Sequence, residues 1–169
     1  NGLGVPKNDE LALKWFTKAA EQGDAKGQTN LGYMYENGQG VPKNYELAVE
    51  WYTKAAEQGV VRAYYRLGFM YGNGHGVPQN DKTAVKWYTK AAMEGHGKAQ
   101  NELGVMYQNG TGVLTDYVRA YMWYNLAAYN GYEMGASRRE KITKIMTLGD
   151  ISKAQEMSTR CLESGYTDC

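Results

Sequence analysis

The sequence predicts an all-α protein: a right-handed α-solenoid of antiparallel helix pairs that ends in a C-terminal helical cap. Three observations predict this fold. A unit of 36 residues recurs, since glycine and tryptophan return at that spacing (Gly23, Gly59, Gly95 and Gly131; Trp15, Trp51, Trp87 and Trp123). Each unit holds two stretches of helical periodicity, one on each side of a glycine-rich loop. The last unit departs from the pattern where a terminal cap is expected. A fixed period of this size indicates stacked supersecondary units.

The first helix of a unit is expected at Ala25–Glu36. Its apolar side is formed by Leu31, Met34 and Tyr35. Asn37 and Gly38 should end it, because both residue types tolerate a left-handed backbone. The loop that follows, Gly38–Lys43, holds two glycines and a proline, which favour turns.

The second helix should begin after Asn44, whose side chain can cap exposed backbone amides. Its apolar stripe has the spacing i, i+3, i+4, i+7, i+8 and consists of Ala48, Trp51, Tyr52, Ala55 and Ala56. Gly59 is expected to close it. We therefore expect two repeated aromatic sets in the core: the four tryptophans, and Tyr35, Tyr71 and Tyr107.

The fourth unit replaces charged residues of the second helix by Met122, Leu126 and Tyr129, which form one apolar stripe. Two amphipathic segments follow, at 133–146 and at about 148–163, the second with a Thr147–Asp150 capping pair. We expect these segments to cover the stripe as a terminal cap. The alternative is that the stripe is an exposed partner surface.

The unit follows the pattern A-x-x-x-x-x-L-G-x-x-Y-x-x-G-x-G-V, then A-x-x-W-x-x-x-A-A-x-x-G. This pattern resembles the Sel-one-like repeat family, a relative of the tetratricopeptide repeat. The resemblance covers residues 1–132, as a half unit at 1–23 and full units at 25–59, 61–95 and 97–131. Residues 133–169 then form the capping helices and tail. Because residue 1 falls inside a unit, we expect the chain to be part of a longer protein.

The resemblance implies a binding scaffold of bacterial origin, with a secreted or periplasmic location favoured over a cytoplasmic one. Some members carry a disulfide in each repeat, and this chain lacks those cysteines. Cys161 and Cys169 lie outside the repeats. They could close a small loop in an oxidising compartment, and two free thiols fit the sequence equally well.

Composition and motifs argue against several functions. The formal net charge is +1 and the basic residues are dispersed, which gives no pull toward nucleic acid. No apolar run is long enough for membrane insertion. The two histidines have no partner at metal-ligand spacing, and no nucleophile or phosphate-loop motif is present. We therefore expect no enzyme, no metal and no cofactor.

The candidate binding site is the variable face of the first helices, which the resemblance places on the concave side of the solenoid. It consists of Lys26, Thr29, Asn30, Tyr33, Arg62, Tyr65, Arg66, Phe69, Lys98, Asn101 and Glu102. The third unit is its expected centre, because it combines arginine with aromatic rings, as binding hot spots do. The alternative for Tyr65 and Phe69 is packing against adjacent units.

These observations favour a scaffold that binds a peptide or a protein surface in the concave groove. Two alternatives stay open: a binder of cell-wall or other small ligands, and a structural spacer within a longer protein.

Overall fold

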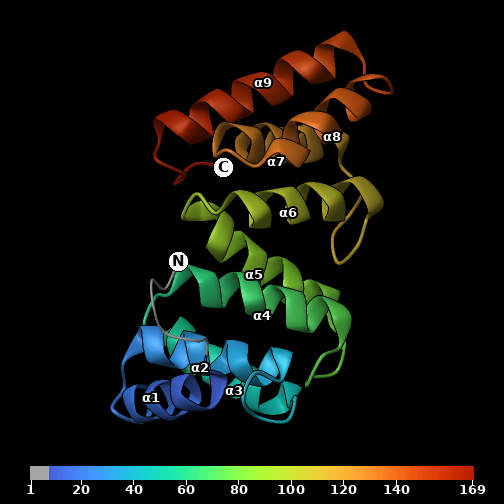
Figure 1. The fold of residues 1–169 in the computed structure, drawn as a ribbon. Coiled ribbons are helices and arrows are strands. Elements are labelled where there is room, and N and C mark those ends of the chain that lie inside the picture. Colours follow the sequence, from blue (N-terminus) through green and yellow to red (C-terminus); the bar gives the residue numbers. More distant parts are fainter. Residues whose placement is uncertain (1–7) are drawn as a thin grey trace. The chain divides into compact units, whose positions relative to one another are not determined.

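The computed structural model describes residues 8–169, so the first part of the half unit 1–23 lies outside the described residues. The described residues form nine α-helices and no strand (Figure 1). The helices are α1 (Asp9–Glu21), α2 (Ala25–Asn37), α3 (Tyr45–Glu57), α4 (Val61–Asn73), α5 (Asp81–Met93), α6 (Gly97–Asn109), α7 (Tyr117–Tyr129), α8 (Glu133–Thr143) and α9 (Leu148–Glu163). The chain divides into two compact parts, called the first unit and the second unit from here on. The first ends at Gln79 and the second begins at Asn80. The 36-residue units of the sequence are called repeats below. None of the described helices is long and apolar enough to cross a bilayer.

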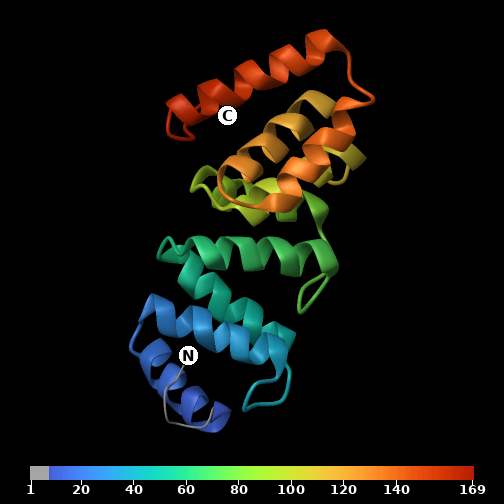
Figure 2. The ribbon, with the colours of Figure 1, turned by 45° about the horizontal axis from the view of Figure 1, so that its top comes forward.

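The first unit contains α1 to α4. Helix α2 packs against α1 on one side and α3 on the other, and α3 also contacts α4 (Figure 2). Its core includes Leu31, Tyr52, Leu67 and Met70, all at most 1% exposed. Because α2 has two helical neighbours, more than half of its circumference is buried.

The helix ends follow the sequence prediction. Asn44 caps α3, and its side-chain oxygen accepts a 2.9 Å hydrogen bond from the Leu47 amide. Gly38 ends α2 in the left-handed conformation, with a φ of 69°. The second loop glycine, Gly40, also has a positive φ, and a Cβ there would lie 2.5 Å from the Asp9 carbonyl oxygen. Each loop therefore packs against the start of an earlier helix, an approach that only glycine permits.

The tryptophans are not the repeated core, contrary to the sequence prediction. Trp15 is 59% exposed, Trp51 and Trp87 are half-buried, and only Trp123 is buried. The core aromatic is the residue that follows each of the last three: Tyr52, Tyr88 and Tyr124 are at most 6% exposed. Neighbouring residues on a helix differ in direction by about 100°, and in α3 and α5 the tyrosine is the one that faces the interior. In α7, which contacts α6, α8 and α9, both Trp123 and Tyr124 are buried.

A lysine three residues later lies over each of the first three tryptophan rings. The ammonium of Lys54, for example, is 4.2 Å from the ring centroid of Trp51, and Lys90 lies 4.6 Å from that of Trp87. A cation over the ring face is attracted by the ring quadrupole while its own charge stays hydrated. Tyr35, Tyr71 and Tyr107 are likewise half-buried rather than core.

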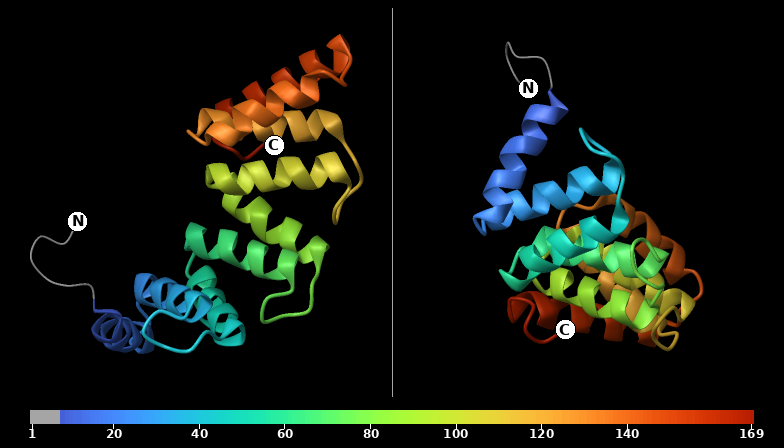
Figure 3. Two further views of the ribbon diagram at one scale, coloured as in Figure 1. Left: turned by 45° about the vertical axis from the view of Figure 1, so that its right-hand side comes forward. Right: turned by 90° about the horizontal axis from the view of Figure 1, so that it is seen from below.

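The second unit ends in the expected helical cap. Helix α7 contacts α6, α8 and α9, so that α8 and α9 both pack on α7 (Figure 3). Ile142 of α8 and Ala154 of α9 join one buried cluster with Tyr124 of α7. Met122 and Leu126 are fully buried, whereas Tyr129 remains 71% exposed and is wrongly predicted as a covered residue.

Local contacts hold α9 at both ends. The Thr147 hydroxyl accepts a 3.1 Å hydrogen bond from the Asp150 amide, which confirms the capping pair. At the other end, a disulfide joins Cys161 and Cys169, whose Cα atoms lie 4.7 Å apart. The Tyr166 hydroxyl in this closed loop contacts the Asn130 side chain at the end of α7.

Candidate functional site

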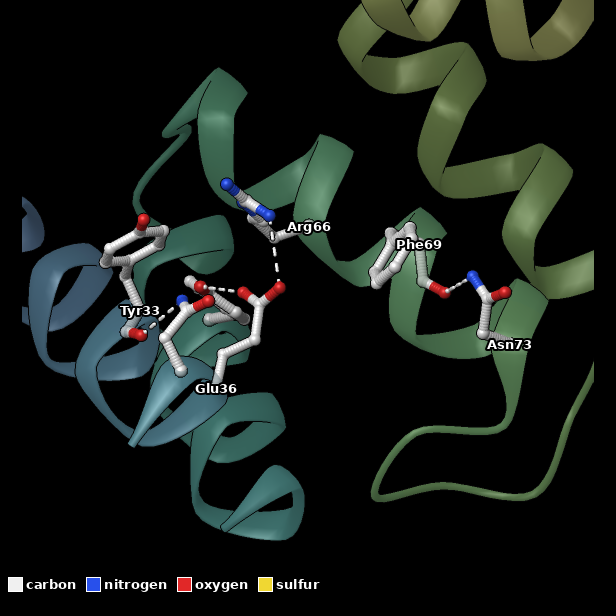
Figure 4. Close-up of polar contacts among 7 residues, drawn as sticks. Tyr33, Glu36, Arg66, Phe69 and Asn73 are labelled. Carbon is white, nitrogen blue, oxygen red and sulfur yellow. Dashed lines mark hydrogen bonds and ion pairs between the residues drawn. The ribbon is translucent and has the colours of Figure 1, made fainter. Parts of the chain in front are cut away.

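Two arginines lie close to the ring of Tyr33, and the three residues form the centre of the candidate site in the first unit. The guanidinium carbons of Arg62 and Arg66 are each 5.3 Å from the centroid of its ring. Arg62 and Arg66 lie one turn apart on α4, so both side chains reach toward α2. Figure 4 shows Tyr33 and Arg66 facing each other across these helices.

The carboxylate of Glu36 joins three helices beside this tyrosine. Arg66 Nη1 on α4 lies 3.1 Å from Glu36 Oε1, and the Tyr52 hydroxyl on α3 donates a 2.5 Å hydrogen bond to Glu36 Oε2 (Figure 4). Glu36 is only 8% exposed. Burial, and then the hydrogen bond to this carboxylate, raise the pKa of Tyr52 above its ordinary value. Arg66 therefore forms an ion pair with Glu36 and also lies over the Tyr33 ring.

Two pockets share Asn30 and Arg62 in their linings, and Tyr33 lines the larger of the two. The larger, of about 340 Å³, is lined by Asn8, Asp9, Ala12, Phe16, Asn30, Tyr33, Met34, Gln39 and Arg62. The smaller, of about 240 Å³, is lined by Lys26, Thr29, Asn30, Val60 and Arg62. Five predicted site residues, Lys26, Thr29, Asn30, Tyr33 and Arg62, thus line these two pockets.

Thr29 and Asn101 are buried and therefore offer little surface to a partner, although Thr29 lines the smaller pocket. Thr29 is 4% exposed and its hydroxyl donates to the Ala25 carbonyl; Asn101 is fully buried. The prediction assumed that about half of each first helix faces solvent. Contact with two neighbouring helices leaves α2 a narrower exposed face, which includes Lys26 and Asn37.

The remaining residues of the third repeat are half-buried. Phe69 meets the His75 ring edge-on at 5.7 Å, and His75 in turn stacks on Tyr45 at 4.5 Å. Tyr65 lies beside Arg66, whose guanidinium is 5.9 Å from the Tyr65 ring centroid. Phe69 thus packs against its own loop, while Tyr65 extends the aromatic and arginine group.

The two other predicted residues belong to the second unit. Lys98 is exposed, and Glu102 is half-buried and accepts a 3.2 Å hydrogen bond from the Asn101 amide.

A family model described as Sel1 repeat matches residues 1–24, 25–60, 61–96 and 97–132. The chain belongs to the Sel1 repeat family. This family consists of non-catalytic repeat scaffolds that commonly bind proteins. No curated protein matches the chain.

Solved structures support the same assignment. A Sel1 repeat protein from Oxalobacter formigenes is 36% identical with a TM-score of 0.78, over 83% of this chain and 57% of that one. A protective antigen of uropathogenic Escherichia coli with an SLR fold is 31% identical with a TM-score of 0.61, over 98% and 44%. Helicobacter pylori cysteine rich protein B is 25% identical with a TM-score of 0.61, over 81% and 98%. The chain spans about half the length of the first two, and the all-α solenoid class is confirmed.

Three buried polar residues of the Sel1 repeats were not predicted from the sequence. One is Glu36. The other two are the glutamines at equivalent positions, Gln28 and Gln100: each accepts a hydrogen bond from a side-chain amide thirty residues later, from Gln58 at 2.7 Å and from Asn130 at 2.9 Å. The recurrence of glutamine at one register position of an otherwise buried face was the available signal.

The Tyr33 group has residue types that are common at binding surfaces. The described residues contain no group of three or more His, Cys, Asp or Glu side chains that could hold a metal ion. The Tyr33 group instead offers cations, amide groups and an aromatic face, which recognise polar or acidic surfaces.

Proposed function

We propose that this Sel1 repeat chain is a protein-interaction scaffold, and that Tyr33, Arg62 and Arg66 are the centre of its partner-binding surface. The observation that carries the proposal is that two guanidinium carbons each lie 5.3 Å from the centroid of the Tyr33 ring. Tyrosine and arginine are enriched among residues that dominate binding energy, because both combine a large contact area with polar groups.

The charges around Tyr33 favour an acidic partner segment. Lys26 and Arg62 are exposed cations, and Arg66 adds a third whose charge is shared with Glu36. Asp9 supplies an acidic side chain on the lining of the larger pocket. An extended peptide with Glu or Asp residues would place carboxylates beside Arg62 and an apolar side chain on the Tyr33 ring.

The test compares two variants that lose the same charge. Lys26→Ala/Arg62→Ala removes exposed cations of the site, and Lys82→Ala/Lys86→Ala removes exposed cations of α5. Arg66 is left in place because its loss would strand the buried carboxylate of Glu36. The probe is an array of acidic peptides, each with a twin in which Gln and Asn replace Glu and Asp.

We expect the unaltered chain and the α5 variant to bind the acidic peptides alike, and the site variant to bind them at least about tenfold more weakly. Binding should also weaken with salt. Equal binding by both variants, or equal binding of the acidic and amide peptides, would contradict the proposal.

A second candidate is a small-ligand binder. The larger pocket supports it, because its volume of about 340 Å³ lies within the range of small-molecule sites. A saturable thermal shift with cell-wall fragments that Tyr33→Ala removes would favour this candidate over the scaffold.

A further inference from the structure

The residues that hold the carboxylate of Glu36 in the first unit have equivalents in the second unit, where no carboxylate stands between them. In the first unit, the Tyr52 hydroxyl and Arg66 hold the carboxylate of Glu36. Two repeats later, the equivalent positions carry Tyr124, Arg138 and Gln108. The two holding groups are the same residue types, and only the acid has become a neutral amide.

The equivalent position in the second unit borders a pocket. This pocket, of about 430 Å³, is lined by Val105, Gln108, Asn109, Tyr124, Arg138 and Lys141. The Tyr124 hydroxyl donates a 2.8 Å hydrogen bond to Gln108 Oε1, so the amide occupies part of the place that Glu36 fills. Arg138 also interacts with the Tyr124 hydroxyl, which partly offsets the rise in the Tyr124 pKa that burial causes.

The pocket has an unbalanced positive charge. Arg138 and Lys141 lie one turn apart on α8, and none of the lining residues is acidic. Within residues 8–169, neither cation forms an ion pair. The nearby acid that acts on Tyr124 is Glu102, which accepts a hydrogen bond from Asn101 instead. A guanidinium and an ammonium that share a pocket without an acid favour an anion of carboxylate size.

We propose that this pocket binds the side-chain carboxylate of a glutamate or aspartate of a partner protein, beside the Gln108 amide that stands where Glu36 stands in the first unit. The inference rests on the proposed function only for the nature of the partner, since its site lies on α6, α7 and α8. The carboxylate would accept hydrogen bonds from Arg138 and contact Lys141. Glu36 shows within the same chain that an arginine at this position of the repeat pairs with a glutamate side chain.

The test is an NMR titration of the whole chain, observed at the Gln108 side-chain amide and the Arg138 Nε–H. The probes are N-acetyl-glutamate amide and its neutral twin N-acetyl-glutamine amide, followed by short peptides that contain one Glu or one Gln. We expect saturable shifts with the acidic probes only, and tighter binding of the acidic peptide than of the single residue. Equal shifts with acidic and neutral probes would overturn the proposal. An acidic peptide that binds no better than the single residue would overturn the assignment to a protein partner.

The matched variant is Gln108→Glu, which supplies the carboxylate from within the chain. It should pair with Arg138, raise the melting temperature and abolish the response to the acidic probes. Arg138→Gln should weaken that response at least about tenfold while the melting temperature changes little, because Arg138 is partly exposed and forms no ion pair within residues 8–169. A full response in either variant would contradict the proposal.

A reciprocal variant uses the first unit. Glu36→Gln should create an acid-dependent response at Arg66 that the unaltered chain lacks. Lys26→Ala/Arg62→Ala should leave the Arg138 response intact. The experiment therefore distinguishes failure of the proposed function at Tyr33 from failure of the proposed pocket at Arg138.

Discussion

The hydroxyl of Tyr52 donates a 2.5 Å hydrogen bond to the carboxylate of Glu36, and this bond joins α3 to α2 inside the first unit. Tyr52 is fully buried and Glu36 is 8% exposed, so neither group can exchange this bond for full hydration. Arg66 completes the contact from α4. One buried carboxylate thereby links three successive helices of neighbouring Sel1 repeats, in a scaffold whose repeats contact only their neighbours.

Removal of the Tyr52 hydroxyl should destabilise the fold. Tyr52→Phe keeps the ring and leaves Glu36 with one partner, so we expect a loss of about 1.5–3 kcal/mol in the free energy of unfolding. Urea denaturation at pH 7 measures it. Tyr129→Phe is the control, because Tyr129 is 71% exposed, and it should change stability by less than about 0.5 kcal/mol. Equal stabilities of the two variants would show that the bond contributes nothing net.

The same hydroxyl predicts a loss of stability at alkaline pH. Burial, and then Glu36, raise the pKa of Tyr52 in the folded state above 10.0, the value of an unperturbed tyrosine. The unfolded chain therefore releases this proton first as the pH rises. The stabilisation is complete below about pH 10 and declines above it, by up to about 1.4 kcal/mol per pH unit for one group.

Unfolding free energies at pH 9, 10 and 11 test this dependence. Tyr52→Phe should flatten the decline, while a remaining slope should persist because burial also raises the pKa of Tyr124. An unchanged slope in the variant would show that Tyr52 does not retain its proton in this range.

The helices, their caps and the terminal cap could be predicted from the sequence because each depends on local residue types. Asn44 as a helix start and Gly38 as a helix end act within a few residues, and the 36-residue period repeats the signal. Burial around a helix was harder to predict. The stripe that contains both Trp51 and Tyr52 has two candidate aromatic residues, and only the direction of the neighbouring helices decides that Tyr52 faces inward.

The candidate site was predictable only in part for the same reason. Lys26, Asn30, Tyr33 and Arg62 lie on the narrow exposed faces and come together as expected. Thr29 was predicted to be exposed and is buried, because contacts with α1 and α3 narrow the exposed face of α2. Glu36 was missed because its partners lie on two other helices, and a single charged residue at a helix end usually indicates solvent.

Gly32 should be intolerant of a methyl group. A Cβ at this position would lie 2.9 Å from two ring carbons of Tyr52 and 3.2 Å from the Ala48 carbonyl oxygen. Tyr52 is fully buried and cannot move aside. We expect Gly32→Ala to cost about 1–3 kcal/mol in unfolding free energy, although alanine is the better helix former by about 1 kcal/mol.

Gly149→Ala is the matched control for this prediction. A Cβ there would meet nothing closer than the Thr147 hydroxyl at 3.8 Å, and Gly149 lies in the first turn of α9. Thermal denaturation should show a melting temperature equal to or above that of the unaltered chain. A stabilising Gly32→Ala would mean that the α2–α3 contact adapts more readily than the packing indicates.

Leu126 should be a residue of the last repeat whose burial depends on the C-terminal cap. Lysine stands at the equivalent positions Lys54 and Lys90, and the Lys54 side chain is 43% exposed, whereas Leu126 is fully buried. Helix α8 follows α7 as α4 follows α3, so the additional cover over Leu126 comes from α9, which packs on α7. Leu126→Lys would place an unpaired ammonium under α9, and we expect it to cost at least about 3 kcal/mol.

Hydrogen exchange and fluorescence distinguish a detached cap from general unfolding. In Leu126→Lys, the amides of α9 should lose protection and the buried Trp123 should become accessible to acrylamide, while α2 and α3 keep their protection. The reciprocal change Lys54→Leu should alter stability by less than about 1 kcal/mol, because it exchanges one exposed side chain for another. If α9 stays protected above a lysine at position 126, the cap does not depend on the apolar residues of α7, and the departure of the fourth repeat from the others needs another cause.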